Sequence, residues 1–99
     1  MSFSEQAQRV IKHIEEQLSL PVESREGKLE DSQLLPALNR VQEMQKQYDT
    51  SQLPKKFLRY ATITRTIIDS WPLGTKIGSS IIDLENEYVK LQSKFDVTG

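Results

Sequence analysis

The chain has 99 residues, contains no cysteine and carries a formal net charge of −1. This length corresponds to one domain, and the lack of cysteine excludes disulfides and thiolate metal sites. The near-neutral charge argues against nucleic acid as the main partner. No apolar run approaches the roughly 20 residues that a membrane-spanning helix needs, so we expect no membrane insertion.

The first predicted element is an amphipathic helix from Phe3 to about Leu18. Ser2 followed by Glu5 fits a capping box at its start. Residues 15–17 lie away from the apolar face and are expected to be exposed. The apolar face follows steps of three and four residues and comprises Phe3, Ala7, Val10, Ile11, Ile14 and Leu18.

Residues 19–28 form a predicted loop, which is interrupted by Pro21 and Gly27. The stretch around Glu23 is polar. Leu20 and Val22 are the only large apolar residues of the loop. They either fold back on the core or line a surface pocket.

The second predicted helix starts near Asp31 or Ser32, which are both favourable N-caps, and ends at residues 49–51. Pro36 falls in its first turn, where the missing amide costs least. Its predicted buried face comprises Leu34, Leu35, Leu38, Val41, Met44 and Tyr48.

The third predicted helix covers residues 53–70, with Ser51 as a cap and Pro54 in the first turn. Its Thr and Ile content also fits a strand, but the length and the steps of three or four residues favour a helix. The predicted apolar face comprises Leu53, Phe57, Ala61, Ile67 and Ile68, flanked by Leu58, Tyr60 and Ile63.

Trp71 is the only tryptophan, and Pro72 and Gly74 follow it. Proline breaks the helical hydrogen-bond ladder, and the residue before it is pushed out of the helical region. We therefore expect Trp71 on a bend, where its ring either fills the core or binds a partner.

The last predicted helix runs from about Thr75 to Phe95, with a frayed tail at 97–99. Ile82 and Val89 widen its apolar face, which comprises Ile77, Ile81, Leu84, Tyr88, Leu91 and Phe95. The elements together predict an all-α fold, a compact right-handed bundle of four or five short helices. The whole chain is expected to be one domain, ordered over residues 3–95.

The sequence offers little support for catalysis. His13 is the only histidine, and a lone histidine without a second ligand makes a poor metal site. No pair of carboxylates is expected on an apolar face, as general acid–base chemistry would need. Residues 74–80 resemble a phosphate loop only faintly, because the motif order and the preceding strand are missing. We therefore expect a non-enzymatic protein with no cofactor and no metal.

Basic residues gather around the third predicted helix and the loop after it. They are Lys55, Lys56, Arg59, Arg65 and Lys76. One interpretation is ordinary surface charge. The other is a positive rim beside the Trp71 loop, which would favour association with an acidic peptide.

The order of apolar positions resembles the leucine-spaced pattern of the TFIIS N-terminal domain. Residues 68–73, leading into the last helix, are most similar to the integrase-binding domain of LEDGF-type chromatin co-activators. In that domain an isoleucine, an aromatic residue and a valine share this spacing in an interhelical loop. The resemblance covers residues 5–95 and is carried by Leu38, Val41, Met44, Thr50, Ser51, Phe57, Leu58, Ile63, Ile67 and Ile68.

The resemblance implies a nuclear, monomeric domain that binds short disordered motifs of transcription or chromatin regulators, often acidic residues followed by phenylalanine. Its pocket lies between the first interhelical loop and the loop before the last helix. The implied peptide-binding residues are Leu18, Leu20, Val22, Glu23, Arg65, Ile68, Trp71, Leu73 and Lys76. The chain departs from the family at Pro21 and Glu23, where the family has a capping aspartate, and at Pro72, where it has a basic residue.

A second hypothesis is a structural subunit of a larger assembly, such as a tethering, kinetochore or Mediator-like complex. The wide apolar face of the last helix, with Ile82 and Val89 outside the main line, would then be an interface. A monomer in solution favours the peptide-binding domain, and an obligate oligomer favours the subunit.

Overall fold

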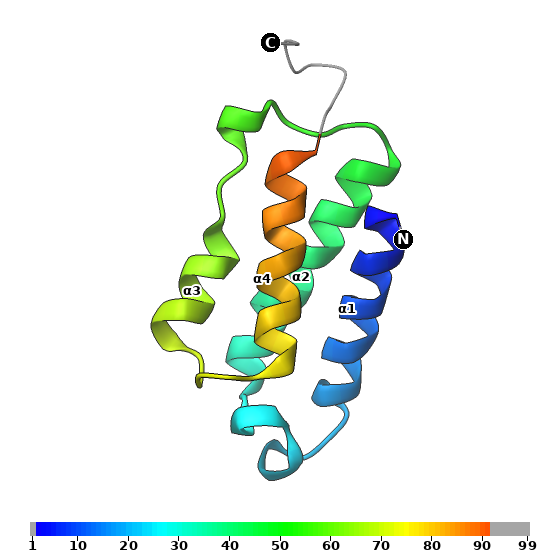
Figure 1. The fold of residues 1–99 in the computed structure, drawn as a ribbon. Coiled ribbons are helices and arrows are strands. Elements are labelled where there is room, and N and C mark those ends of the chain that lie inside the picture. The colour runs from blue at the N-terminus through cyan, green and yellow to red at the C-terminus, as the bar shows by residue number, and fades with distance from the viewer. Residues whose placement is uncertain (1, 92–99) are drawn as a thin grey trace.

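The computed structural model describes residues 2–91, and this part of the chain is an all-α bundle without strands (Figure 1). The expected helical bundle is confirmed. No helix in the described range is long and apolar enough to cross a bilayer. The α-helices are α1 (Phe3–Leu18), α2 (Asp31–Asp49), α3 (Thr62–Ser70) and α4 (Lys76–Lys90), and the short 3₁₀ turns are η1 (Val22–Ser24), η2 (Glu26–Lys28) and η3 (Lys56–Leu58).

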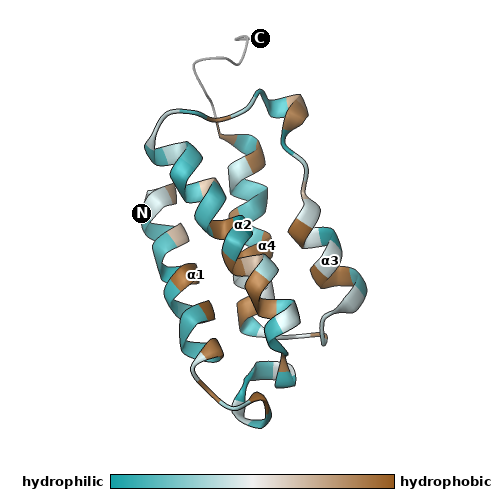
Figure 2. Cartoon of the chain, turned by 180° about the vertical axis from the view of Figure 1, so that it is seen from behind, coloured by the Kyte–Doolittle hydropathy of each residue, from teal (hydrophilic) through white to brown (hydrophobic). Residues whose placement is uncertain are grey.

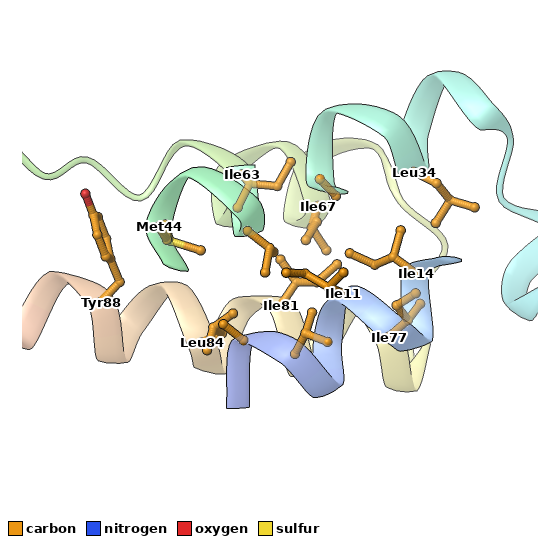
Figure 3. Close-up of a cluster of buried hydrophobic side chains, with 14 of the residues drawn as sticks. Ile11, Ile14, Leu34, Met44, Ile63, Ile67, Ile77, Ile81, Leu84 and Tyr88 are labelled. Atoms are coloured by element: carbon orange, nitrogen blue, oxygen red, sulfur yellow. The ribbon is translucent and has the colours of Figure 1, made fainter. Parts of the chain in front are cut away.

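The core lies where α1, α2 and α4 meet, and α3 closes it from one edge of the bundle. α1 packs against α2 and α4, whereas α3 packs mainly against α4. Figure 3 shows side chains from all four helices pointing into this space. Each fully buried aliphatic or aromatic side chain contributes roughly 1.5–3 kcal/mol. The largest fully buried apolar side chains are Tyr88, Ile14, Leu29, Leu34, Met44, Ile77, Ile81 and Val41.

Side chains cap the starts of three helices. The Ser2 hydroxyl accepts the Glu5 amide at 3.1 Å, as predicted for α1. α2 begins at Asp31, but its N-cap is Glu30 rather than Asp31 or Ser32. The Thr75 hydroxyl accepts the Gly78 amide at 3.2 Å and caps α4. The predicted extension of this helix to Phe95 and the tail at 97–99 lie outside the described residues.

The predicted third helix is wrong over residues 53–61, because α3 begins only at Thr62. The Arg59 side chain is 5% exposed. Its guanidinium donates to the carbonyls of Pro54 at 2.7 Å and Leu91 at 2.5 Å. The Leu58 amide bonds to Lys55 in a 3₁₀ turn. These contacts hold the segment as a turn followed by extended chain, and tertiary hydrogen bonds override the local helical pattern.

The late start of α3 changes which side chains are buried. Phe57, Ala61 and Ile68 were predicted on the apolar face, yet all three are exposed. Ile63 and Ile67 are buried instead. In the same way Leu35 on α2 is exposed, because the buried face of that helix runs through Leu34, Ala37, Val41 and Met44.

Gln17 was predicted to be exposed, but it is buried near the end of α1. Its side-chain oxygen accepts the backbone amide of Glu26 at 2.8 Å. Arg25, in the following loop, is also buried and donates to the carbonyls of Leu18 and Leu20. Because these bonds satisfy carbonyls at the end of the helix, the loop after α1 is tied closely to it.

Candidate functional site

Exposed apolar side chains gather along the edge of the bundle formed by η3 and α3. Five of the eight large apolar side chains that are exposed in the described residues lie on this stretch, which we call the α3 edge: Phe57, Leu58, Tyr60, Ile68 and Leu73. Figure 2 shows the apolar positions of η3 and α3 on the side of the bundle away from α1. Contiguous exposed apolar surface marks interaction sites on many monomeric proteins.

A groove of about 510 Å³ lies on the α3 edge, and its lining is mainly apolar. Tyr60 and Ile68 contribute apolar surface, and Arg65 and Asp69 contribute opposite charges. Thr64 also lines the groove, and its hydroxyl is buried without a hydrogen-bond partner in the described part of the chain. Of these residues, Tyr60, Thr64 and Asp69 were missed as site residues. Tyr60 was predicted to flank the apolar face of the helix, and the pattern gave no signal for Thr64 or Asp69.

A buried carboxylate from α4 positions the start of α3. Glu85 is fully buried, and its side chain accepts the amide of Thr64 at 2.8 Å. Arg40 of α2 donates to the other oxygen of Glu85 at 2.8 Å and to the Tyr60 carbonyl at 2.9 Å. α3 has no side-chain cap of its own, so Glu85 supplies the negative charge that a helix start favours.

The expectation concerned pairs of carboxylates, and α4 places a single one, Glu85, on its apolar face. Glu85 stands between Leu84 and Tyr88 on the inner face of that helix. A buried charge requires a partner and hydrogen bonds. Both are present here, and they link α2, α3 and α4 immediately behind the groove.

Trp71 lies in the core, with 5% of its surface exposed. Its ring packs close to Gly78, where an added Cβ would lie 3.6 Å from the indole Cε3 atom. The indole nitrogen has no hydrogen-bond partner among the described residues. A hollow of about 130 Å³ adjoins the ring and is also lined by Leu73 and Ile82. Trp71 is therefore a packing residue with a small hollow beside it.

The two loops that were predicted to frame a pocket are in direct contact. Gly27 has a φ of +57°, and an added Cβ there would lie 2.9 Å from Thr75 Cγ2 and 3.0 Å from Pro72 Cγ. At this point the loops leave no space for a side chain. The hollow beside Trp71 is lined by residues of the range 67–82 and by none from the first loop.

The predicted site residues consequently fall into two groups. Arg65, Ile68 and Leu73 are exposed around α3 and the turn after it, and Trp71, directly after α3, is buried. Lys76, also exposed, opens α4. The other group belongs to the end of α1 and the first loop, where Leu18 is half-buried and the exposed residues are Leu20, Val22 and Glu23.

Glu26 joins the first loop to α1 and α4. One carboxylate oxygen lies 2.5 Å from Nε2 of His13, and the other accepts the Ile77 amide at 3.1 Å. Burial alone would raise the pKa of Glu26. The hydrogen bonds from Ile77 and His13, together with the charge of His13, outweigh burial and hold this pKa below its ordinary value of 4.5.

The lowered pKa of Glu26 predicts a loss of stability in acid. A carboxyl group whose pKa is lower in the folded state stabilises that state above its ordinary pKa, and the contribution disappears as the pH falls through the folded value. We expect Glu26→Gln to show a smaller decrease in urea midpoint between about pH 5.5 and pH 3 than the unchanged protein. Glu15→Gln, at an exposed position on α1, is the control and should follow the unchanged protein. Equal slopes for all three proteins would contradict the assignment.

No known protein family, curated protein or solved structure matches this chain. Residues 2–91 contain no group of three His, Asp or Glu side chains that could hold a metal ion. The α3 edge, with its groove and its flanking charges, is the surface from which a function can be argued.

Proposed function

We propose that the chain is a non-catalytic protein-interaction domain that binds a short disordered segment of a partner protein. The observation that carries the proposal is the exposed apolar α3 edge, with a groove of about 510 Å³. Burying one aromatic side chain there would contribute roughly 1.5–3 kcal/mol. A few hydrogen bonds and charge contacts would bring the affinity into the micromolar range.

The resemblance in sequence pattern supports the choice of partner. It points to acidic motifs with an aromatic residue, as found in nuclear regulators of transcription or chromatin. Apart from the buried Arg59, residues 55–69 contain three basic residues and one acidic residue in a chain with a net charge of −1. This local excess of positive charge fits an acidic segment, since complementary charge speeds association and rejects wrong partners.

A structural subunit of a larger assembly is the second candidate. The length of the α3 edge favours it, because exposed apolar side chains occur from η3 to the turn after α3. Figure 1 shows that this stretch runs along the whole of one side of the bundle. Light scattering after size exclusion separates the two functions. A monomer close to 11.4 kDa supports the peptide-binding domain, and a stable oligomer supports the subunit.

We expect the domain to bind the synthetic peptide acetyl-Glu-Asp-Asp-Phe-Asn-Ile-amide, which we call the acidic probe. Amide shifts in proton–nitrogen NMR should saturate in the micromolar range. The control peptide, with alanine in place of phenylalanine, should bind at least tenfold more weakly, because it lacks the aromatic ring that is buried. A flat response to the acidic probe up to about 1 mM would overturn the proposed function.

A further inference from the structure

We infer that the groove on α3 is where the acidic segment binds, with its carboxylates beside Arg65 and its apolar side chain on Ile68. This inference rests on the proposed function and names the site and the chemistry of the occupant. Arg65 and Ile68 are both exposed, and both line the groove of about 510 Å³. They stand three positions apart on α3 and therefore lie on the same side of the helix.

The groove has the features of a preformed site. The Glu85 carboxylate holds the amide of Thr64 at 2.8 Å and so fixes the backbone at one wall. The Thr64 hydroxyl in that wall has no partner among the described residues. A buried polar atom without a partner is costly, so this wall of the groove is not fully satisfied by the described residues.

The charges around the groove select between occupants. Lys55 and Arg65 have exposed side chains on this edge, and Asp69 is the single acidic residue between positions 55 and 69. A symmetric contact between two copies places the same patch on both sides, so an excess of positive over negative charge would meet the same excess. An acidic segment meets opposite charge instead, and we therefore assign the groove to a different, acidic partner.

The groove also carries charges of opposite sign at different points along its length. Asp69 follows Ile68 directly, whereas Arg65 precedes it by about one turn of the helix. Carboxylates of the occupant are therefore favoured on the Arg65 side of the apolar contact and disfavoured on the Asp69 side. The occupant should carry its acidic residues on one side of the apolar residue, and a neutral or basic residue should suit the other side.

Point substitutions test the location. Ile68→Ser and Arg65→Glu should each weaken binding of the acidic probe about tenfold. Leu35→Ser and Arg9→Glu are matched controls at exposed positions on α2 and α1, and they should leave the affinity unchanged. Asp69→Asn should strengthen binding by roughly two- to threefold because a like charge is removed. A gain of affinity cannot result from misfolding.

Three outcomes would overturn the inference, and they bear differently on the proposed function. If Leu20→Ser and Val22→Ser weaken binding while Ile68→Ser does not, the probe binds at the first loop and only the location is wrong. If the unchanged protein forms a dimer that Ile68→Ser dissociates, the occupant is a second copy. If neither the unchanged protein nor Asp69→Asn binds the acidic probe, the location and the proposed function both fail.

Discussion

Glu85→Ala is expected to lower the free energy of unfolding by about 3–5 kcal/mol, the usual cost of breaking a buried ion pair. The substitution leaves Arg40 without its buried partner and the Thr64 amide without an acceptor. Domains of this kind have only about 5–15 kcal/mol of stability in total. Urea unfolding followed by far-ultraviolet circular dichroism would measure the change.

Two variants control this experiment. Glu87→Ala removes an exposed carboxylate from the same helix and should change stability by no more than about 0.5 kcal/mol. Glu85→Gln keeps an oxygen that can accept the Thr64 amide but removes the negative charge opposite Arg40, so its stability should be intermediate. If Glu85→Ala unfolds at the same urea concentration as Glu87→Ala, the buried pair does not hold α3.

Trp71→Ala is expected to cost about 3–5 kcal/mol, as large-to-small substitutions in a core commonly do. The ring is 5% exposed and lies with Ile67 and Gly78 at the junction of α3 and α4. Part of the cost is the lost burial, and part is the cavity left behind. Thermal unfolding followed by circular dichroism should show a clearly lower midpoint.

The control for Trp71→Ala is Trp71→Phe, which retains an aromatic ring and should lose much less stability. Whether this turn contributes to partner binding can be tested separately with Leu73→Ala. Leu73 is 96% exposed, so its truncation should not destabilise the fold. An unchanged midpoint for Trp71→Ala would mean that the indole does not stabilise the core.

Elements whose signals are local could be predicted from the sequence. For α1 the regular apolar spacing and the Ser2 cap gave the observed bounds. The start of α4 near Thr75 was also predicted from local signals. In contrast, residues 53–61 contain an apolar pattern and an early proline that both suit a helix. Their real conformation depends on hydrogen bonds from Arg59 to carbonyls at the end of α4, about 30 positions away, and no local pattern reports such contacts.

The same limit applies to the candidate site. Ile67 and Ile68 are neighbours in the sequence, so their side chains point in different directions on a helix. Only the true position of the helix decides which of them is exposed. The basic residues illustrate the point too, since Arg65 is exposed whereas Arg59 is buried and bonded internally. Sequence reasoning identified this region as important but could not separate surface residues from internal ones.

The enclosure of the single indole gives the domain an internal optical reporter. Trp71 is the only tryptophan, and its nitrogen lacks a hydrogen-bond partner in the described structure. Its fluorescence in the native state should therefore be blue-shifted relative to an indole in water. Because Trp71 follows the last residue of α3, a red shift of its emission would report that water has reached the junction of α3 and α4.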